Sequence, residues 1–281
     1  MDAIVLAAGE GTRFFAGSFE KRPLPGVLEY PIPKSLYPVA VPGVNAPPKP
    51  MLGHVITSLQ DGGMETVWIA TGHLGEKISA FVETTFDGSR VVAIPPHDSI
   101  DYRKGPLYTL AGMLDTLNER GILAQQGFDK MIMLSPSDLI IDRKAIYYMA
   151  GIPARGMMAS RSRAHVIIEN RPGSVKKGAH TALKDLVPPR FQHLFDAAML
   201  GCHVVPIVAV HLDILSSALH GIEKSRTKFA EILRDWLDAN VNDDREFRSE
   251  FNIIQSVFLG DRFYWYDLDT MDAVKEMESK G

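Results

Sequence analysis

The sequence predicts an α/β fold, a three-layer sandwich in which a mostly parallel sheet carries helices on both faces. Apolar runs of strand length alternate with amphipathic segments of helical period, and the runs are apolar throughout instead of alternating with polar residues. Strands buried on both faces read in this way, and the crossover between parallel strands is usually a helix. Glycine-rich or polar residues follow several runs. Ligands bind such sheets beyond the carboxyl ends of the strands, so these residues are the first candidates for a site.

The first half of the chain gives the clearest pattern. We predict a strand at Ala3–Ala7, which starts almost at the first residue, and then a long loop region at 9–50 that is rich in Gly and Pro. A helix is predicted to begin at Pro50 and to stop at Gly62 or Gly63, with one apolar face. Further elements follow in alternation: a strand at 66–71, a helix at 75–86, a strand at 90–94, a helix from Pro106, and a strand within 129–141 that ends in a polar loop around Asp138.

The second half is less regular. Strands are expected at 157–160, 164–169 and 201–210, around an irregular polar stretch at 171–189. Two helices at 213–222 and 227–239 lead to an aromatic segment at 262–270 and a final helix at 271–280. No repeat or linker divides the chain. We therefore predict a single Rossmann-like domain over 1–281, with 151–210 as an inserted lid on one side of the site.

Composition narrows the class of protein. The 281 residues carry a formal net charge of −4, so no global basic field favours nucleic acid or anionic lipid as a partner. The single cysteine, Cys202, excludes an internal disulfide and a thiolate metal cluster. The sequence shows neither a signal-peptide pattern nor an apolar run long enough to span a bilayer, which predicts a cytoplasmic protein without a membrane partner.

The stretch that follows the first strand, "LAAGEGTR", is the strongest local signal. Small residues there let backbone N–H groups approach an anion, and Arg13 can form paired hydrogen bonds to phosphate oxygens. A tight turn without a ligand is the alternative. No Gly-Lys-Ser/Thr follows, and Phe14 stands where a dinucleotide-binding loop needs its third glycine, so neither of those motifs fits. The residues expected to contact a phosphate-bearing ligand are Leu6, Ala7, Ala8, Gly9, Glu10, Gly11 and Thr12.

A second cation lies in "PIPKSLYPV". Lys34 follows Pro33, and prolines on both sides stiffen its backbone, which suits a cation that must be held against a phosphate. An ordinary surface lysine in a proline-rich loop is the alternative. Lys49, beside Pro50, is a second candidate for the same role.

These motifs, in this order, resemble the nucleotidyltransferase superfamily. Its members include sugar-1-phosphate nucleotidyltransferases and the choline-phosphate and inositol-phosphate cytidylyltransferases. The resemblance rests on Gly11-Thr12-Arg13, then Pro33-Lys34 after a gap longer than usual, and on "GHLGEKI", "GPLYTLAGML", "MIMLSPSDLII" and "WYDLDTMDAVKEM". It covers residues 1–142 and the end of the chain, and it is poor over 151–255.

The resemblance implies roles for residues outside the glycine-rich loop. Arg13 and Lys34 become the catalytic cations, and Gly72, Gly105 and Thr109 are expected at the nucleotide. Pro106 removes one backbone donor at that turn. The implied ligands of a magnesium ion are Asp138, Asp267 and Asp269.

The chemistry of such a reaction fits these residue types. An acceptor phosphate attacks the α-phosphate of a nucleoside triphosphate, and both partners are anions, so alignment and charge neutralisation dominate. Mg²⁺ takes one or two carboxylates together with phosphate oxygens and water. Helix capping is the competing role for the acids, although Asp142 fits the cap of the helix after Asp138 better, and Thr270 or Asp269 could start the last helix.

The predicted function is therefore Mg²⁺-dependent nucleotidyl transfer from an NTP to a phosphorylated alcohol. A sugar-1-phosphate is favoured over choline or inositol phosphate as the acceptor, and the resemblance leaves room for a homodimer. A nucleotide-binding regulator of the same fold is the alternative, motivated by the unusual "SPSD" and the proline-rich insertion. A nicotinamide-dependent dehydrogenase is weaker, because the dinucleotide fingerprint is incomplete.

Overall fold

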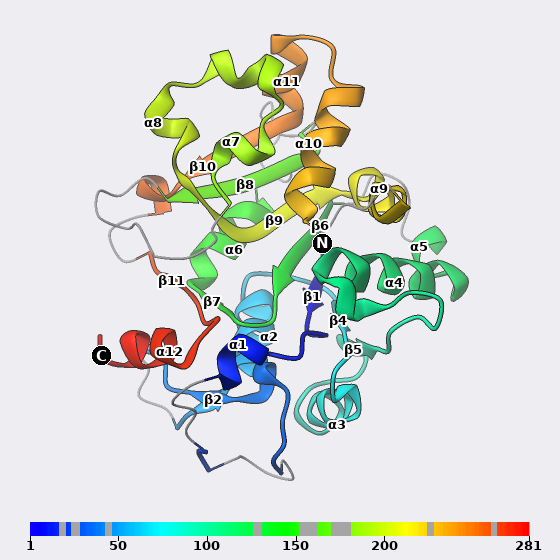
Figure 1. Cartoon of the computed structure of the whole chain (residues 1–281), viewed down its shortest axis with the longest axis vertical. Coiled ribbons are helices and arrows are strands. Elements are labelled where there is room, and N and C mark those ends of the chain that lie inside the picture. Colours follow the sequence, from blue (N-terminus) through cyan, green and yellow to red (C-terminus); the bar gives the residue numbers. More distant parts are fainter. Residues whose placement is uncertain are drawn as a thin grey trace.

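The computed structural model is built around a seven-stranded sheet of order β10-β8-β9-β6-β1-β4-β5 (Figure 1). The structure describes residues 1–16, 21–23, 29–42, 47–125, 131–151, 162–169, 181–223, 228–259 and 263–280. The strands of the sheet are β1 (Asp2–Leu6), β4 (Val67–Ala70), β5 (Val91–Ile94), β6 (Met131–Pro136), β8 (Ala164–Glu169), β9 (His203–His211) and β10 (Phe251–Gln255).

The sheet is mostly parallel, as predicted. β1 pairs in parallel with β4 and β6, β4 with β5, and β8 with β10. Only β9 runs against its neighbours β6 and β8. The carboxyl ends of β1, β4 and β6 therefore meet at one edge of the sheet, which is where ligands bind in this architecture.

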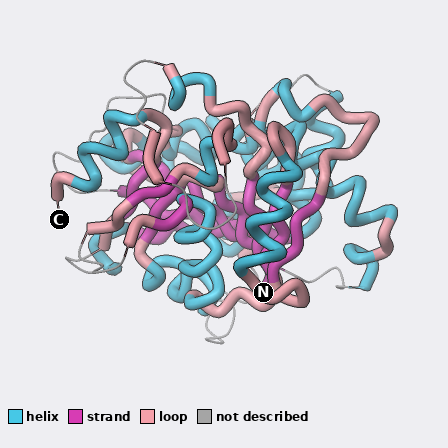
Figure 2. Tube along the Cα trace, turned by 90° about the horizontal axis from the view of Figure 1, so that it is seen from below, coloured by secondary structure: helices cyan, strands magenta, loops and turns pink. Residues whose placement is uncertain are grey.

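Helices cover both faces of the sheet, so that the molecule has three layers (Figure 2). One hydrophobic core lies between the sheet and α2, α3, α6 and α12, and a second lies between the sheet and α4, α7, α9, α10 and α11. Alternate residues of β1 enter different cores, with Ala3 and Val5 in the first and Ile4 in the second. Burial on both faces is the physical reason for the continuous apolar runs in the sequence. The helices are α1 (Thr12–Phe15), α2 (Met51–Asp61), α3 (Gly75–Thr85), α4 (Pro106–Glu119), α5 (Ile122–Gln125), α6 (Arg143–Gly151), α7 (Leu183–Leu186), α8 (Ala197–Leu200), α9 (Leu212–Glu223), α10 (Phe229–Asn240), α11 (Asp244–Glu250) and α12 (Met271–Glu278).

The expected long loop at 9–50 contains short ordered elements. These are α1, a 3-10 turn η1 (Lys34–Leu36) and the two-residue strands β2 (Pro38–Val39) and β3 (Lys49–Pro50), which pair with each other. These elements were not predicted, because segments this short have no periodicity to detect. The helix predicted after Pro50 is α2, which ends at Asp61 before Gly62.

The region after residue 151 differs more from the expectation. β8 and nearly all of β9 fall in 151–210 and are strands of the main sheet, and α7, α8 and the 3-10 turn η5 (Pro189–Leu194) lie between them. The predicted strand at 157–160 and most of the polar stretch at 171–189 fall outside the described residues. α11 and β10 were not expected, and β10 ("FNIIQ") lacks the alternation that would have marked it.

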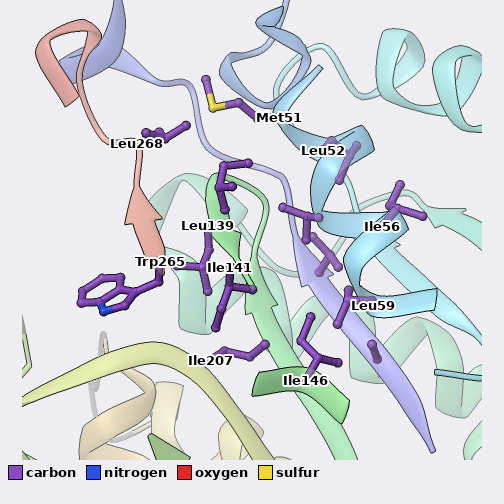
Figure 3. Packing of buried hydrophobic residues seen from close by; sticks show 14 of the residues in the cluster. Met51, Leu52, Ile56, Leu59, Leu139, Ile141, Ile146, Ile207, Trp265 and Leu268 are labelled. Atoms are coloured by element: carbon purple, nitrogen blue, oxygen red, sulfur yellow. The ribbon is translucent and has the colours of Figure 1, made fainter. Parts of the chain in front are cut away.

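The segment before α12 lies at the edge of the sheet where β6 ends. β11 (Trp265–Asp267) pairs antiparallel with β7 (Leu139–Ile141), next to α12 (Figure 1). Figure 3 shows Leu139 and Ile141 of β7 between α2 on one side and Trp265 and Leu268 on the other. All four residues are at most 6% exposed, so β7 and β11 are held in place by a packed core.

Over the described residues, none of the helices combines the length and the apolar character that crossing a membrane requires.

Candidate active site

The glycine-rich loop begins where β1 ends and is anchored to β4 and the loop after it. Leu6 is the last residue of β1, and Ala7 and Ala8 are buried beneath the loop. The N–H of Ala7 donates to the Ala70 carbonyl at 2.9 Å, and the N–H of His73 donates to the Ala8 carbonyl at 3.0 Å. Gly9, Glu10 and Thr12 follow on the surface, with Glu10 and Thr12 exposed. The loop therefore has a fixed base and an accessible tip.

Gly11 is required at its position for two reasons. Its φ of +66° lies in the left-handed region, and its carbonyl accepts the N–H groups of Phe14 and Phe15 at the start of α1. A Cβ built on Gly11 would lie 2.8 Å from the Cβ of Lys34. The loop and the Lys34 segment are therefore in direct contact, and this contact leaves no room for a side chain.

Three carboxylates from distant parts of the sequence converge beside this loop. One carboxylate oxygen from each of Asp138, Asp267 and Asp269 lies within 4.8 Å of the others. Asp138 occupies the turn between β6 and β7, Asp267 ends β11, and Asp269 follows two residues later. The Leu268 N–H donates to the Asp138 carbonyl at 3.1 Å, and Asp267 pairs with Leu139. Main-chain pairing of β7 with β11 thus brings the acids together.

Both predicted cations contact these acids. The ammonium of Lys34 donates to Asp138 and to Asp269 Oδ1, the latter at 3.1 Å. Arg13 Nη1 lies 3.1 Å from Asp269 Oδ2, although the Arg13 side chain is 72% exposed and free to meet a ligand. Lys49, the alternative to Lys34, lies exposed in β3 opposite Val39.

Burial and charge act in opposite directions on Lys34. Burial lowers the pKa of its amine, but the carboxylates of Asp138 and Asp269, which attract and accept from the ammonium, outweigh burial and raise the pKa above its ordinary value. Lys34 therefore stays charged at neutral pH. A fixed positive charge at this place suits a site that receives polyphosphate.

The competing role of the acids, helix capping, is taken by other residues. Asp142 Oδ1 accepts the N–H of Lys144 at 2.9 Å, at the start of α6. Thr270 caps α12, and its hydroxyl accepts the Ala273 N–H at 3.2 Å. The carboxylates of Asp138 and Asp269 are thus directed to the cluster. Oxygen-only donors with net negative charge are the set that Mg²⁺ prefers, so the residues present fit this ion.

The residues expected near the nucleotide base lie on the other side of the loop. A Cβ on Gly72 would meet the Ala8 Cβ at 2.5 Å and Tyr102 at 2.8 Å. Gly105, with a φ of +132°, begins α4, and its carbonyl accepts from the N–H of Thr109, which is buried. Gly72 and Gly105 therefore both lie against Tyr102, since the Gly105 N–H also donates to the Tyr102 carbonyl at 3.2 Å, and Thr109 lines a narrow hollow together with Tyr102.

Sequence reasoning missed Tyr102 and its neighbour Arg103. They belong to a 3-10 turn, η2 (Tyr102–Lys104), whose start is capped by the Asp101 carboxylate accepting the Arg103 N–H at 3.1 Å. Arg103 lies 3.7 Å from Glu10 of the glycine-rich loop. Asp101, four residues before "GP", was the available sequence signal for this turn, since Asp commonly caps short turns.

An open pocket of about 360 Å³ lies on the outer side of the glycine-rich loop. Its walls come from the loop, from α1, from the segment around Tyr30 and from the start of α3, and the residues that line it are Glu10, Phe15, Lys21, Tyr30, Pro31, Ile32, His73 and Leu74. His73, whose N–H donates to the Ala8 carbonyl, is thus shared between the loop anchor and this pocket.

Solved structures share this fold over nearly the whole chain. A putative glucose-1-phosphate thymidylyltransferase from Bacillus anthracis matches with a TM-score of 0.59 and 14% identity, covering 99% of this chain and 94% of that one. The inositol-1-phosphate CTP transferase of T. maritima matches with a TM-score of 0.59 and 14% identity, covering 99% and 95%. A UDP-glucose pyrophosphorylase complexed with UDP-glucose matches with a TM-score of 0.60 and 14% identity, covering 99% and 97%.

The chain thus shares its fold with these solved structures, and the predicted three-layer α/β architecture is confirmed. No family model matches the sequence, and no curated protein matches it either. At this level of identity the likeness defines the architecture, and the activity must be argued from the site itself.

Proposed function

We propose that this protein transfers a nucleotidyl group from an NTP to a phosphorylated alcohol, releasing pyrophosphate. The observation that carries the proposal is the convergence of Asp138, Asp267 and Asp269 within 4.8 Å, with Lys34 and Arg13 in contact with them beside the glycine-rich loop. Anionic reactants need fixed positive charge and a divalent ion, and this edge of the sheet offers residues for both.

In the proposed reaction an oxygen of the acceptor's phosphate attacks the α-phosphorus of the NTP. The bond from that phosphorus to the bridging oxygen of the β-phosphate breaks, and pyrophosphate leaves with the electron pair. A phosphate monoester is already largely dianionic near pH 7, so no side chain has to remove a proton. When bound at the acids, Mg²⁺ would supply charge neutralisation for the phosphate oxygens.

The chain's own residues contribute positioning and charge. Backbone N–H groups of the loop from Gly9 to Thr12 are suited to the phosphates, since small residues allow close approach. The Lys34 ammonium and the exposed Arg13 guanidinium are suited to the departing pyrophosphate, whose charge grows as the bond breaks. Gly72, Gly105 and Thr109 are proposed to border the base, and Tyr102 has to shift or share that space.

The neighbours suggest the acceptor. Their names refer to glucose-1-phosphate, inositol-1-phosphate and UDP-glucose, and on that analogy we propose a sugar-1-phosphate, with a polyol or choline phosphate as the second choice. Residues 151–210 are proposed to form the acceptor side of a single domain. A cytoplasmic location and a homodimeric assembly stay predictions from the sequence.

Pyrophosphate release tests the proposal. The four NTPs are first ranked by thermal shift with Mg²⁺, and each is then combined with sugar-1-phosphates, inositol phosphate and choline phosphate. We expect release with at least one pair and none after chelation of the metal. Tight NTP binding without release for any acceptor would instead support the nucleotide-binding regulator.

A further inference from the structure

Helix α12 is joined by a paired ion contact to Arg22, a residue that also contacts the segment that carries Lys34. Arg22 Nη1 and Nη2 donate to Glu278 Oε1 and Oε2 at 2.6 and 2.8 Å, and both side chains are about one-fifth exposed. Paired arginine–carboxylate bonds fix orientation as well as distance, which single surface ion pairs do not. This contact is hereafter the Arg22–Glu278 clasp.

The clasp contacts the backbone at the first residue of β2 and just after the strand ends. Glu278 Oε1 also accepts the Ala40 N–H at 3.0 Å, and Arg22 Nη1 donates to the Pro38 carbonyl at 3.3 Å. The Arg22 guanidinium lies 5.2 Å from the centre of the Tyr37 ring. Helix α12 therefore holds the stretch from Tyr37 to Ala40, which starts three residues after Lys34.

The two halves of the site differ in how they are supported. Asp138, Asp267 and Asp269 are held together by the β7–β11 pairing and by the Leu268–Asp138 main-chain bond. Lys34 lies in η1, and the strand that follows it pairs over only two residues with β3. The Lys34 segment also has main-chain support, since the Tyr37 carbonyl accepts the Met51 N–H at 3.0 Å, and Leu36 and Tyr37 are buried. The acids are joined to one another by main-chain bonds, whereas the clasp links the Lys34 segment to the helix that follows Asp269.

We propose that Arg22 and Glu278 are positioning residues, which hold the Lys34 ammonium against Asp138 and Asp269. The inference deepens the proposed function and rests on it for the catalytic consequence. The helix that follows Asp269 is also the helix that grips the Lys34 segment, so one rigid element sets the distance between the cation and the acids. Met271, Val274 and Met277 lock that helix into the core.

The test compares Glu278→Gln with Glu276→Gln. The first removes the charge and the paired geometry of the clasp, and the second removes an exposed ion pair with Lys280 on the same helix. Amine labelling followed by mass spectrometry reads the state of Lys34 without reference to activity. We expect labelling of Lys34 to rise severalfold in Glu278→Gln, because an amine released from its two carboxylate contacts becomes more accessible to the reagent, and to stay unchanged in Glu276→Gln.

Kinetics then separate positioning from general stability. In Glu278→Gln we expect kcat to fall by about tenfold or more, as misplacement of a reacting group does, while the Mg²⁺ concentration for half-activation stays unchanged because the acids keep their places. The double variant Arg22→Glu/Glu278→Arg is expected to restore part of the loss. Unchanged Lys34 labelling in Glu278→Gln, or an equal rise in Glu276→Gln, would overturn the proposal. If the wild type released no pyrophosphate, the proposed function would fail while the labelling still decided whether the clasp positions Lys34.

Discussion

Two ionisable side chains in this molecule are removed from water with opposite consequences. Lys34, at the site edge, meets two carboxylates, which hold its pKa above the ordinary value despite burial. His165, in β8, is fully buried, and burial lowers its pKa to about 4. Its Nδ1 faces the Asn252 amide at 3.2 Å, and its Nε2 meets no hydrogen-bond partner in the described chain.

The opposite directions of the two pKa shifts follow from the charges around each side chain. Burial penalises the charged form of both side chains, but only at Lys34 do opposite charges converge to offset the penalty. A site that handles anions keeps its cation charged, whereas a side chain inside the sheet is kept neutral. Opposite charge, and not burial alone, therefore distinguishes the environment of Lys34 from that of His165.

The largest expected effect on turnover comes from replacing Asp138, which belongs to the acidic cluster and contacts Lys34. Asp138→Ala takes away one carboxylate of the metal-binding set and one partner of Lys34, so we expect turnover to fall by about a thousandfold or more with the fold retained. Pyrophosphate release and thermal unfolding measure the two effects. Asp142→Ala is the matched control, because Asp142 caps α6 four residues away, and it should cost about 1 kcal/mol of stability without loss of turnover. Near wild-type rates in Asp138→Ala would contradict the metal assignment.

The second prediction concerns Arg13, the exposed cation that pairs with Asp269. Arg13→Ala should cost about 2–4 kcal/mol of transition-state stabilisation, measured as kcat/KM, because a charge opposite the leaving group is lost. Its exposure predicts that the free energy of unfolding changes little. Arg143→Ala, which removes a similarly exposed arginine paired with Asp61 at 3.8 Å, should leave kcat/KM unchanged. Equal losses in the two variants would mean that Arg13 acts only through general surface charge.

His165 sharpens the comparison through pH. The pKa of His165 is about 4 in the folded chain and 6.5 ordinarily. Between pH 4 and pH 6.5 the imidazole is therefore protonated in the unfolded chain and neutral in the folded chain. The contribution of neutral His165 to the free energy of unfolding is therefore fully present above pH 6.5. It is lost as pH falls toward 4, and the loss is on the order of 3 kcal/mol.

Urea unfolding between pH 7 and pH 4 measures this effect. We expect the decline in stability to be smaller in His165→Leu than in wild type. It should not be smaller in His193→Gln, because the hydrogen bond to Asp244 raises the pKa of His193 and so favours the folded chain at low pH. Parallel pH profiles for wild type and His165→Leu would show that His165 is not kept neutral by burial.

The smallest expected effect concerns the amide beside His165. Asn252→Ala leaves Nδ1 without its partner, which should cost about 1–3 kcal/mol of folding free energy and leave pyrophosphate release unchanged. Asn240→Ala, at an exposed helix end where the amide donates to the Trp236 carbonyl at 2.8 Å, should cost less. A larger loss at Asn240 would mean that the amide of Asn252 contributes little to the buried pair.

Much of the site could be read from the sequence because its signals are local. The strand before Ala7, the small residues up to Gly11, and the apolar face of α2 follow from periodicity and from the needs of a tight turn. Arg13 and Lys34 were predicted from residue type, from their local sequence and from the family resemblance, and both contact the acids in the structure. The turn η2 with Tyr102 escaped notice, as did β10, because neither has a periodic pattern.

By itself the sequence determined the layers of the fold and the identity of the charged residues, because hydrophobic period and residue chemistry are properties of short segments. Only the tertiary structure decided that Asp138 and Asp269 share one cluster, that Lys34 and not Lys49 meets them, and that Tyr102 packs against Gly72. The pairing of β7 with β11 joins segments more than a hundred residues apart, and no local pattern encodes which distant strands will pair.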